Sequence, residues 1–235
     1  MKLLYLIPGS VGPGFDADEV KRRERILQGI VSPGTAITAD VSGEGPLSIE
    51  SACDEANSIP SMIRRAVLAE KEGCDGIIIG CAGDPGIECL KEAVTIPVVG
   101  PAQVSFAYAN LVGRRFSVIT PVDSTVGTTI DLVRKYGYTE SLASIRSAQV
   151  SVLDITRDPL IAEKRSGEEA ITARDRDGAD CIVLGCMSLA FAGFDARLSQ
   201  KIGIPVINPV KAAVYTLETM VKMQLAQSGK AFPHR

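Results

Sequence analysis

The chain has 235 residues, of which 46% are hydrophobic and only 5% aromatic, so it can build an aliphatic core for one large domain or two small ones. Its formal net charge of −3 provides no basic face of the kind that binds nucleic acid. The first apolar run stops at Pro8, too early for a signal peptide, and no later apolar stretch is long enough to span a membrane. We therefore expect a cytoplasmic protein that binds neither nucleic acid nor a membrane.

The first half of the chain alternates short apolar runs with helical patterns, which is typical of βαβ units and a parallel sheet. Asp16 followed by Glu19 predicts a capping box, which opens a helix that ends near residue 30. The basic run at residues 21–25 is predicted to form a solvated face of that helix. Pro60 is predicted to start a second helix. Strands are predicted near residues 2–7, 35–41, 75–80 and 96–99.

The second half repeats the same alternation of strands and helices. Helices are predicted near residues 124–136, 159–177, 193–201 and 209–227, and strands near residues 115–120, 148–153, 180–185 and 204–207. Continuous apolar runs at residues 77–79 and 182–184 are typical of strands buried on both faces of a parallel sheet. Residues 229–235 are predicted to form a loose tail.

The two halves also resemble each other in sequence. The run at residues 73–81 recurs at residues 178–186, about 105 residues later, and both runs end in Gly-Cys. Residues 96–101 are likewise answered by residues 204–209. A period this long predicts two similar domains.

Cys81 and Cys186 occupy matching positions in this duplication, each directly after a glycine that ends a predicted strand. Ligands of open parallel sheets bind beyond the carboxyl ends of the strands. A helix start is predicted after each cysteine, with Asp84 as N-cap before Pro85 in the first half and with Ser188 as cap in the second. A thiol just before a helix N-terminus is favoured as thiolate.

Two thiols on opposite sides of one cleft suit the inversion of a carbon acid. This reaction needs a base on one face of a small-molecule substrate and an acid on the other, and cysteine can hold either state near neutral pH. The developing oxyanion needs donors aimed at it. We expect the backbone N–H groups of Ala82, Gly83, Met187 and Ser188 to supply them.

Other chemistry is poorly supported by the sequence. A metal site at Cys181 and Cys186 lacks partners because the only histidine is His234, and there is no Cys-x-x-Cys redox motif. The glycine-rich segment at residues 9–14 has neither the lysine of a P-loop nor the dinucleotide-binding spacing. The remaining cysteines are interpreted as small buried hydrophobes: Cys53, Cys74, Cys89 and Cys181.

Five segments that span nearly the whole chain resemble the aspartate/glutamate/hydantoin racemase superfamily. The likeness is greatest to its hydantoin racemase branch, which includes allantoin racemases. The Cys-x-Gly-Asp-Pro-Gly element at residues 81–86 discriminates best, because aspartate and glutamate racemases tend to have an Asn-Thr pair after the first cysteine. The five segments are residues 45–51, 80–86, 96–100, 115–120 and 184–187.

The resemblance implies an α/β fold of two pseudo-symmetric flavodoxin-like domains, each with a mostly parallel four-stranded sheet flanked by helices. It implies an active site between the domains, with Cys81 and Cys186 as the catalytic pair and with neither pyridoxal phosphate nor metal as cofactor. It also implies that the C-terminal helix packs back on the first domain, so that residues 1–98 with 207–235 form one lobe and residues 99–206 form the other. The implied reaction is racemisation of a 5-substituted hydantoin or a cyclic ureide such as allantoin.

One position departs from the family pattern. The first strand of the family commonly ends in Pro-Asn, whereas this chain has Gly9 in place of the asparagine. The hydroxyls of Ser10 and Thr120 are candidates for substrate binding, and each could instead cap a turn. An amino-acid racemase of the aspartate/glutamate type and a non-catalytic two-lobed small-molecule binding protein remain alternative functions. The sequence leaves assembly into a homo-oligomer open.

Overall fold

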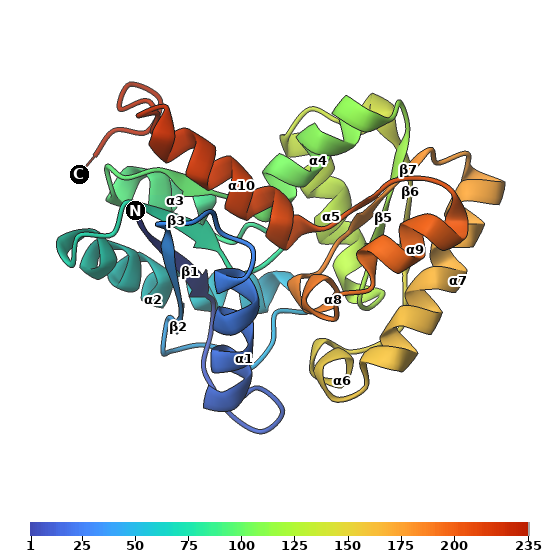
Figure 1. The fold of residues 1–235 in the computed structure, drawn as a ribbon, viewed down its shortest axis with the longest axis horizontal. Coiled ribbons are helices and arrows are strands. Elements are labelled where there is room, and N and C mark those ends of the chain that lie inside the picture. Colours follow the sequence, from blue (N-terminus) through green and yellow to red (C-terminus); the bar gives the residue numbers. More distant parts are fainter. Residues whose placement is uncertain (235) are drawn as a thin grey trace. The chain divides into compact units, whose positions relative to one another are not determined.

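The computed structural model describes residues 1–234, in which strands alternate with helices along the chain (Figure 1). The chain divides into two compact units. Unit 1 contains Met1–Pro101 together with the residues from Ala213 onward, and unit 2 contains Ala102–Ala212.

Unit 1 is built on a four-stranded parallel sheet with the strand order β2-β1-β3-β4. Strands β1 and β3 lie in the middle of the sheet, and their apolar side chains are buried against helices. The strands are β1 (Lys2–Ile7), β2 (Ala36–Val41), β3 (Gly76–Ile79) and β4 (Val98–Val99). The helices are α1 (Ala17–Gln28), α2 (Ala52–Lys71), α3 (Ile87–Ala93) and, crossing in from unit 2, α10 (Pro209–Lys222).

Unit 2 repeats this plan with the strand order β6-β5-β7-β8, again all parallel. Its strands are β5 (Phe116–Thr120), β6 (Leu142–Ser147), β7 (Cys181–Leu184) and β8 (Val206–Ile207). Its helices are α4 (Pro101–Val112), α5 (Ser124–Lys135), α6 (Val152–Arg157), α7 (Pro159–Asp177), α8 (Met187–Phe191) and α9 (Asp195–Ile202), with a 3₁₀ turn at Thr139–Ser141. The predicted fold class, two four-stranded parallel sheets flanked by helices, is confirmed.

Two predicted elements are wrong. A strand was expected at residues 148–153, but the strand in this part of the chain, β6, ends at Ser147. The residues that follow lead into α6, whose N-cap Ser151 accepts from the Asp154 N–H (3.1 Å). The helix expected to start at Pro60 is α2, which begins at Ala52 and contains Pro60 in its interior. Its start is set by Ser51, whose hydroxyl accepts from the Asp54 N–H (3.2 Å).

The basic run on α1 is only partly solvated, so the prediction for it is wrong at Arg23. This side chain is 3% exposed, with its guanidinium 2.8 Å from the Glu19 carboxylate and 4.6 Å from the centre of the Phe15 ring. The guanidinium of Arg22 binds the same carboxylate at 2.6 Å. The pair Glu19–Arg23 therefore belongs to the packed side of the helix.

Residues after unit 2 complete unit 1. The Glu218 carboxylate on α10 accepts from the Ser32 N–H (2.9 Å) and from the Thr35 hydroxyl (2.7 Å). Burial opposes ionisation of this carboxyl, but these hydrogen bonds outweigh it and hold the pKa of Glu218 below its ordinary value. The Gln227 amide donates to the Val94 and Ile96 carbonyls (2.7 and 3.0 Å).

The predicted loose tail is wrong for the residues that the structure describes. The Phe232 ring lies under the Lys91 ammonium (5.2 Å), and His234 Nδ1 is 3.1 Å from the Glu92 carbonyl oxygen. Arg235 lies outside the described residues. The expected helix also ends at Lys222, five residues earlier than the sequence pattern suggests.

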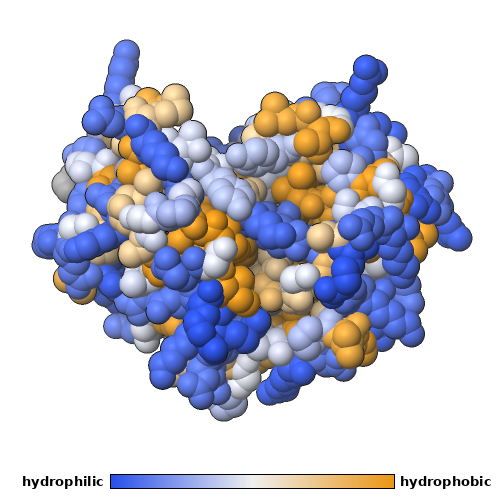
Figure 2. Space-filling model, in the orientation of Figure 1, coloured by the Kyte–Doolittle hydropathy of each residue, from blue (hydrophilic) through white to orange (hydrophobic). Residues whose placement is uncertain are grey.

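Apolar residues occur at several places on the surface. Figure 2 shows them in several patches between hydrophilic residues on the face that it presents. Leu111 and Leu160, each 77% exposed, are the most exposed large apolar side chains in the described chain. No helix within residues 1–234 has the length and apolarity needed to cross a membrane.

Candidate active site

Cys81 lies at the carboxyl end of the sheet in unit 1. It follows β3, and the Gly80 N–H extends the ladder to β1 by donating to the Leu6 carbonyl (2.7 Å). The thiol is half-buried against the apolar cluster beneath the sheet. The Gly83 N–H points back at the Cys81 sulfur (3.4 Å). This donor can hydrogen-bond the sulfur of Cys81.

The turn after Cys81 differs from the predicted one. Asp84 is 2% exposed, has a φ of +50°, and is followed by Pro85 outside any helix. Its N–H donates to the Cys81 carbonyl (3.1 Å), so the chain makes a tight turn before α3 begins at Ile87. The prediction of Asp84 as N-cap and Pro85 as first helical residue is therefore wrong. The donor that reaches the thiol is in the turn and not in a helix.

A carboxylate beside Cys81 was missed by the sequence analysis. A Cβ added to Gly83 would lie 2.4 Å from Glu55 Oε1 and 3.6 Å from Cys81 Sγ, so carboxylate and thiol border the same small space. Glu55 is in the first turn of α2. The signal was present, because α2 directly follows the segment at residues 45–51 that carries the family resemblance.

Cys186 occupies the matching place in unit 2. It follows β7, and the Gly185 N–H donates to the Ile119 carbonyl on β5 (2.8 Å). Its side chain is 8% exposed and belongs to an apolar cluster that includes Ile155. Cys186 itself is the N-cap residue of α8, whereas Ser188 lies inside that helix, so the prediction of Ser188 as cap is wrong.

The two units share a second local motif, and they diverge beside it. Ser51 donates to the Asp54 carboxylate at the start of α2, and Ser151 donates to the Asp154 carboxylate at the start of α6, both at 2.7 Å. The next residue is Glu55 in unit 1 and Ile155 in unit 2. Cys81 therefore has a carboxylate neighbour, whereas the corresponding residue in the cluster of Cys186 is apolar and 1% exposed.

The predicted substrate-binding residues fall at the carboxyl ends of the same sheets. Ser10 follows β1, and its hydroxyl donates to the Gly45 carbonyl (2.9 Å). Thr120 ends β5, is fully buried, and donates to the Arg146 carbonyl (3.3 Å). Ala82 and Gly83 are half-exposed beside Cys81, whereas Met187 is 3% exposed and follows Cys186. Their roles toward a substrate stay predictions.

The structure explains why Gly9 stands where the family has asparagine. Gly9 has a φ of +93°, and a Cβ on it would lie 2.1 Å from the Pro46 carbonyl oxygen. Its backbone is also fixed, since its N–H donates to the Ser42 hydroxyl (2.9 Å) and its carbonyl accepts from the Gly43 N–H (3.0 Å). A side chain at residue 9 is incompatible with this arrangement of the loop.

We expect Gly9→Asn to destabilise the protein and not to restore the family's amide. The clash with backbone should lower the free energy of unfolding by about 1–3 kcal/mol, in addition to the strain of a positive φ. Gly34→Asn is the matched control, because Gly34 has a similar φ of +84° but nothing within 4 Å of its added Cβ. Urea unfolding of both variants measures the difference. Equal destabilisation of the two would refute the steric explanation.

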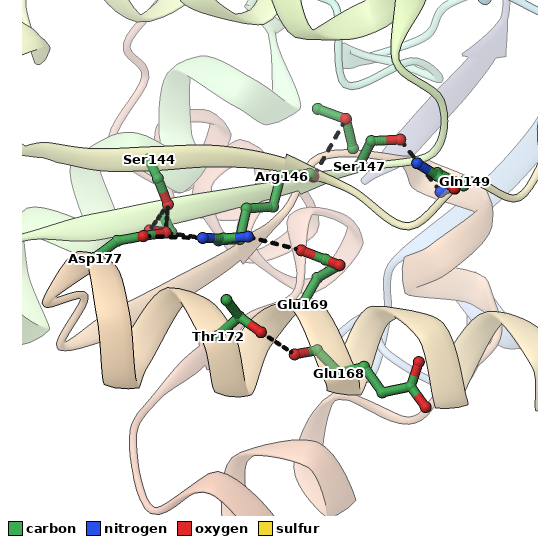
Figure 3. Close-up of polar contacts among 10 residues, drawn as sticks. Ser144, Arg146, Ser147, Gln149, Glu168, Glu169, Thr172 and Asp177 are labelled. Atoms are coloured by element: carbon green, nitrogen blue, oxygen red, sulfur yellow. Dashed lines mark hydrogen bonds and ion pairs between the residues drawn. The ribbon is translucent and has the colours of Figure 1, made fainter.

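An open pocket of about 380 Å³ lies in unit 2 beside the edge strand β6 and contains none of the predicted site residues. Figure 3 shows its ion-pair network, in which Arg146 binds Asp177 (2.6 Å) and Glu169 (3.0 Å). The hydrogen bond to Asp177 raises the pKa of the Arg146 guanidinium against the opposing effect of burial. Ser144 also donates to Asp177 (2.5 Å). These groups satisfy one another, which is typical of a structural network.

The other cysteines differ from the prediction in part. Cys181 is fully buried, and burial raises the pKa of its thiol to about 12, so it is an unreactive core residue as expected. Cys74 is half-buried. Cys53 and Cys89 are exposed on α2 and α3, so their interpretation as buried hydrophobes is wrong. Within residues 1–234 no three His, Cys, Asp or Glu side chains are grouped so that they could hold a metal ion.

Comparison with known proteins identifies close relatives. The family described as Asp/Glu/Hydantoin racemase matches residues 13–217. A hydantoin racemase of Pseudomonas sp. (strain NS671) is 35% identical over 213 residues, which are 91% of this chain and 85% of that protein. Among solved structures, allantoin racemase from Klebsiella pneumoniae is 28% identical with a TM-score of 0.90, covering 100% of this chain and 95% of that one. Allantoin racemase from Pseudomonas fluorescens is 27% identical with a TM-score of 0.91, covering 100% and 97%.

Proposed function

Because the chain belongs to the Asp/Glu/hydantoin racemase family and is therefore an isomerase, we propose that it racemises 5-substituted hydantoins or a related cyclic ureide such as allantoin. The reaction transfers protons between the substrate and two thiols, Cys81 and Cys186. In this proposal one thiol serves each face of the C5 carbon of the substrate.

The observation that carries the proposal is the repetition of one cysteine site. Cys81 and Cys186 follow equivalent central strands, β3 and β7, and each is preceded by a glycine whose N–H bonds to the neighbouring strand. Inversion at carbon needs a proton acceptor on one face and a proton donor on the other. A duplicated thiol meets this need without a second kind of catalytic group.

The chemistry of the substrate fits thiols as bases. The C5 hydrogen of a hydantoin lies beside a neutral ring carbonyl, so the negative charge left by deprotonation spreads onto the carbonyl oxygen. In an amino acid, the same charge would form beside an ionised carboxylate. The C5 proton of a hydantoin is therefore easier to remove than the corresponding proton of an amino acid. Cysteine ionises near enough to neutral pH to act as the base in its thiolate form and as the acid in its thiol form.

The remaining groups have supporting roles in the proposal. The Gly83 N–H stabilises the Cys81 thiolate, which it already contacts at 3.4 Å. Ala82, Met187 and Ser188 provide backbone N–H groups to the developing oxyanion. Ser10 and Thr120 provide hydroxyls at the ends of β1 and β5. In each turnover one thiolate takes the C5 proton while the opposite thiol gives its own proton to the other face, so the proton count of the enzyme is unchanged.

A substrate panel tests the proposal. Loss of optical rotation should be followed for single enantiomers of 5-substituted hydantoins, allantoin, aspartate and glutamate. We expect at least one cyclic ureide to be racemised, and neither aspartate nor glutamate. Racemisation of aspartate or glutamate alone would favour the amino-acid alternative. Tight binding of a ureide without any loss of rotation would favour a binding protein.

A further inference from the structure

We propose that Glu55 determines specificity, by accepting a hydrogen bond from a ring N–H of the ureide beside Cys81 and by repelling substrates that carry a carboxylate. The inference rests on the proposed function and deepens it, because it names the feature that separates a neutral cyclic ureide from an amino acid. Glu55 has no part in proton transfer in this scheme.

The first argument is position. Glu55 Oε1 and Cys81 Sγ both lie within 4 Å of the point where a Cβ of residue 83 would be, at 2.4 and 3.6 Å. Glycine at residue 83 leaves that space free of side chain. Its N–H takes part as well, since it donates to the Cys81 sulfur. A molecule whose reacting carbon approaches the thiol therefore comes close to the carboxylate.

The second argument is that the backbone of Glu55 is held in place. The residue is in the first turn of α2, directly after Asp54, whose carboxylate accepts from the Ser51 hydroxyl (2.7 Å) and the Glu50 N–H (3.1 Å). Behind it, the Ser58 hydroxyl donates to the Glu55 carbonyl (2.7 Å). A rigid helix start aims a side chain with less conformational entropy loss on binding than a loop does.

The third argument is chemical complementarity. A hydantoin ring carries two N–H donors, and an ionised carboxylate offers about four lone-pair sites, so Glu55 can accept from the ring while it keeps its contacts within the protein. Hydrogen bonds to a charged group are stronger than those between neutral groups. An amino acid or a ring-opened ureide would instead bring its own carboxylate toward Glu55, and two like charges at short range repel.

The fourth argument is the difference between the two units. The residue that matches Glu55 after the repeated Ser-x-x-Asp motif is Ile155, which is 1% exposed in the cluster of Cys186. An acidic residue is thus not demanded by the motif or by the start of the helix. At the position that the motif matches, the acceptor is present beside Cys81 and is replaced by an apolar residue in the cluster of Cys186, so it would fix which side of the ureide ring faces Cys81.

The experiment compares two probes on the full-length protein: 5-methylhydantoin, and N-carbamoylalanine, which is the carboxylate formed when water opens the ring of 5-methylhydantoin. The readout is protection of Cys81 from iodoacetamide, mapped by peptide mass spectrometry, so it does not require turnover. In the unmodified protein, 5-methylhydantoin should protect Cys81 at a lower concentration than N-carbamoylalanine does, and the ratio of these two concentrations is the preference. In Glu55→Gln, which keeps an acceptor oxygen but removes the charge, the preference should fall by about tenfold or more.

Two further variants complete the test. Glu72→Gln removes a carboxylate at the other end of α2, where it pairs with Arg65, and should leave the preference unchanged. Gly83→Ala should lower the preference like Glu55→Gln, because the added Cβ displaces the carboxylate. A merely structural role for Glu55 would weaken protection by both probes equally.

The outcomes separate the two proposals. Suppose that 5-methylhydantoin protects Cys81, but that Glu55→Gln and Gly83→Ala show the same preference as the unmodified protein. The inference is then wrong and the proposed function stands. If no hydantoin protects Cys81 in the unmodified protein, the proposed function fails and takes the inference with it. A 5-methylhydantoin that is methylated at both ring nitrogens has no N–H to donate. If it protected Cys81 as well as the parent compound does, the inference would also be overturned.

Discussion

Replacing either Cys81 or Cys186 by serine should abolish racemisation but leave hydrogen exchange at C5 for one enantiomer only. The surviving thiolate can still remove the proton from its own face and return a deuteron to that face in D₂O. A serine hydroxyl is a poor base near neutral pH, so no proton is removed from the face that the replaced cysteine would serve as base. The two variants should therefore exchange opposite enantiomers.

The size of the effect follows from the loss of a positioned acid or base, which typically contributes about 10²–10⁴-fold to the rate. Polarimetry measures inversion, and proton NMR in D₂O measures exchange. Cys89→Ser is the matched control, since Cys89 is exposed on α3 and should be replaceable without effect on either measurement. Exchange of the same enantiomer by both variants, or racemisation by either at the unmodified rate, would rule out a two-base mechanism.

Replacing Glu19 by alanine should lower the free energy of unfolding by about 3–5 kcal/mol, the usual cost of leaving one member of a buried ion pair without its partner. Arg23 is 3% exposed, and the substitution removes the carboxylate that lies 2.8 Å from its guanidinium. Asp18→Ala is the control on the same helix turn. Asp18 is 91% exposed and 3.8 Å from Lys21, so its loss should cost about 0.5 kcal/mol or less.

The Glu19 pair should also appear in the pH dependence of stability. Burial opposes ionisation of Glu19, but hydrogen bonds from Arg22 and Arg23 outweigh it, so the pKa of Glu19 lies below its ordinary value. A carboxyl whose pKa is lowered on folding binds fewer protons in the folded state. Its stabilisation is present above the ordinary pKa and is lost as the pH falls through the lowered one. Urea unfolding across that range should show a smaller acid-induced loss for Glu19→Ala, and an equal loss in both proteins would contradict this account.

The sequence predicted the sheets well because their central strands are fully buried. Ile77 and its neighbours on β3, like Ile182 and its neighbours on β7, form the continuous apolar runs that are typical of strands covered on both faces. The edge strand β6 was misplaced because it is only half-buried and carries Arg146 and two serines, so its composition does not mark it as a strand. The apolar run that follows it packs through a turn and α6 instead.

The candidate site was predictable where the duplication marked it and hidden where the halves differ. Cys81 and Cys186 stood out because the same Gly-Cys ending occurs twice. Glu55 has an apolar counterpart, so repetition could not select it. Its place just after the family segment at residues 45–51 was a signal, but the fold was needed to show that the first turn of α2 reaches the residues after β3. Pro60 added to the difficulty by suggesting a helix start eight residues too late.

The discontinuity of unit 1 has a consequence for the order in which the chain folds during synthesis. Unit 2 is one continuous segment, so it can reach its packed state as soon as residue 212 has emerged from the ribosome. Unit 1 emerges first but cannot finish first, because the Val98 N–H and the Ser32 N–H find their acceptors on Gln227 and Glu218. Until those residues are made, nascent unit 1 exposes the apolar surface on which Leu217 later packs. We expect chaperones that bind apolar surface to act on the chain during this period.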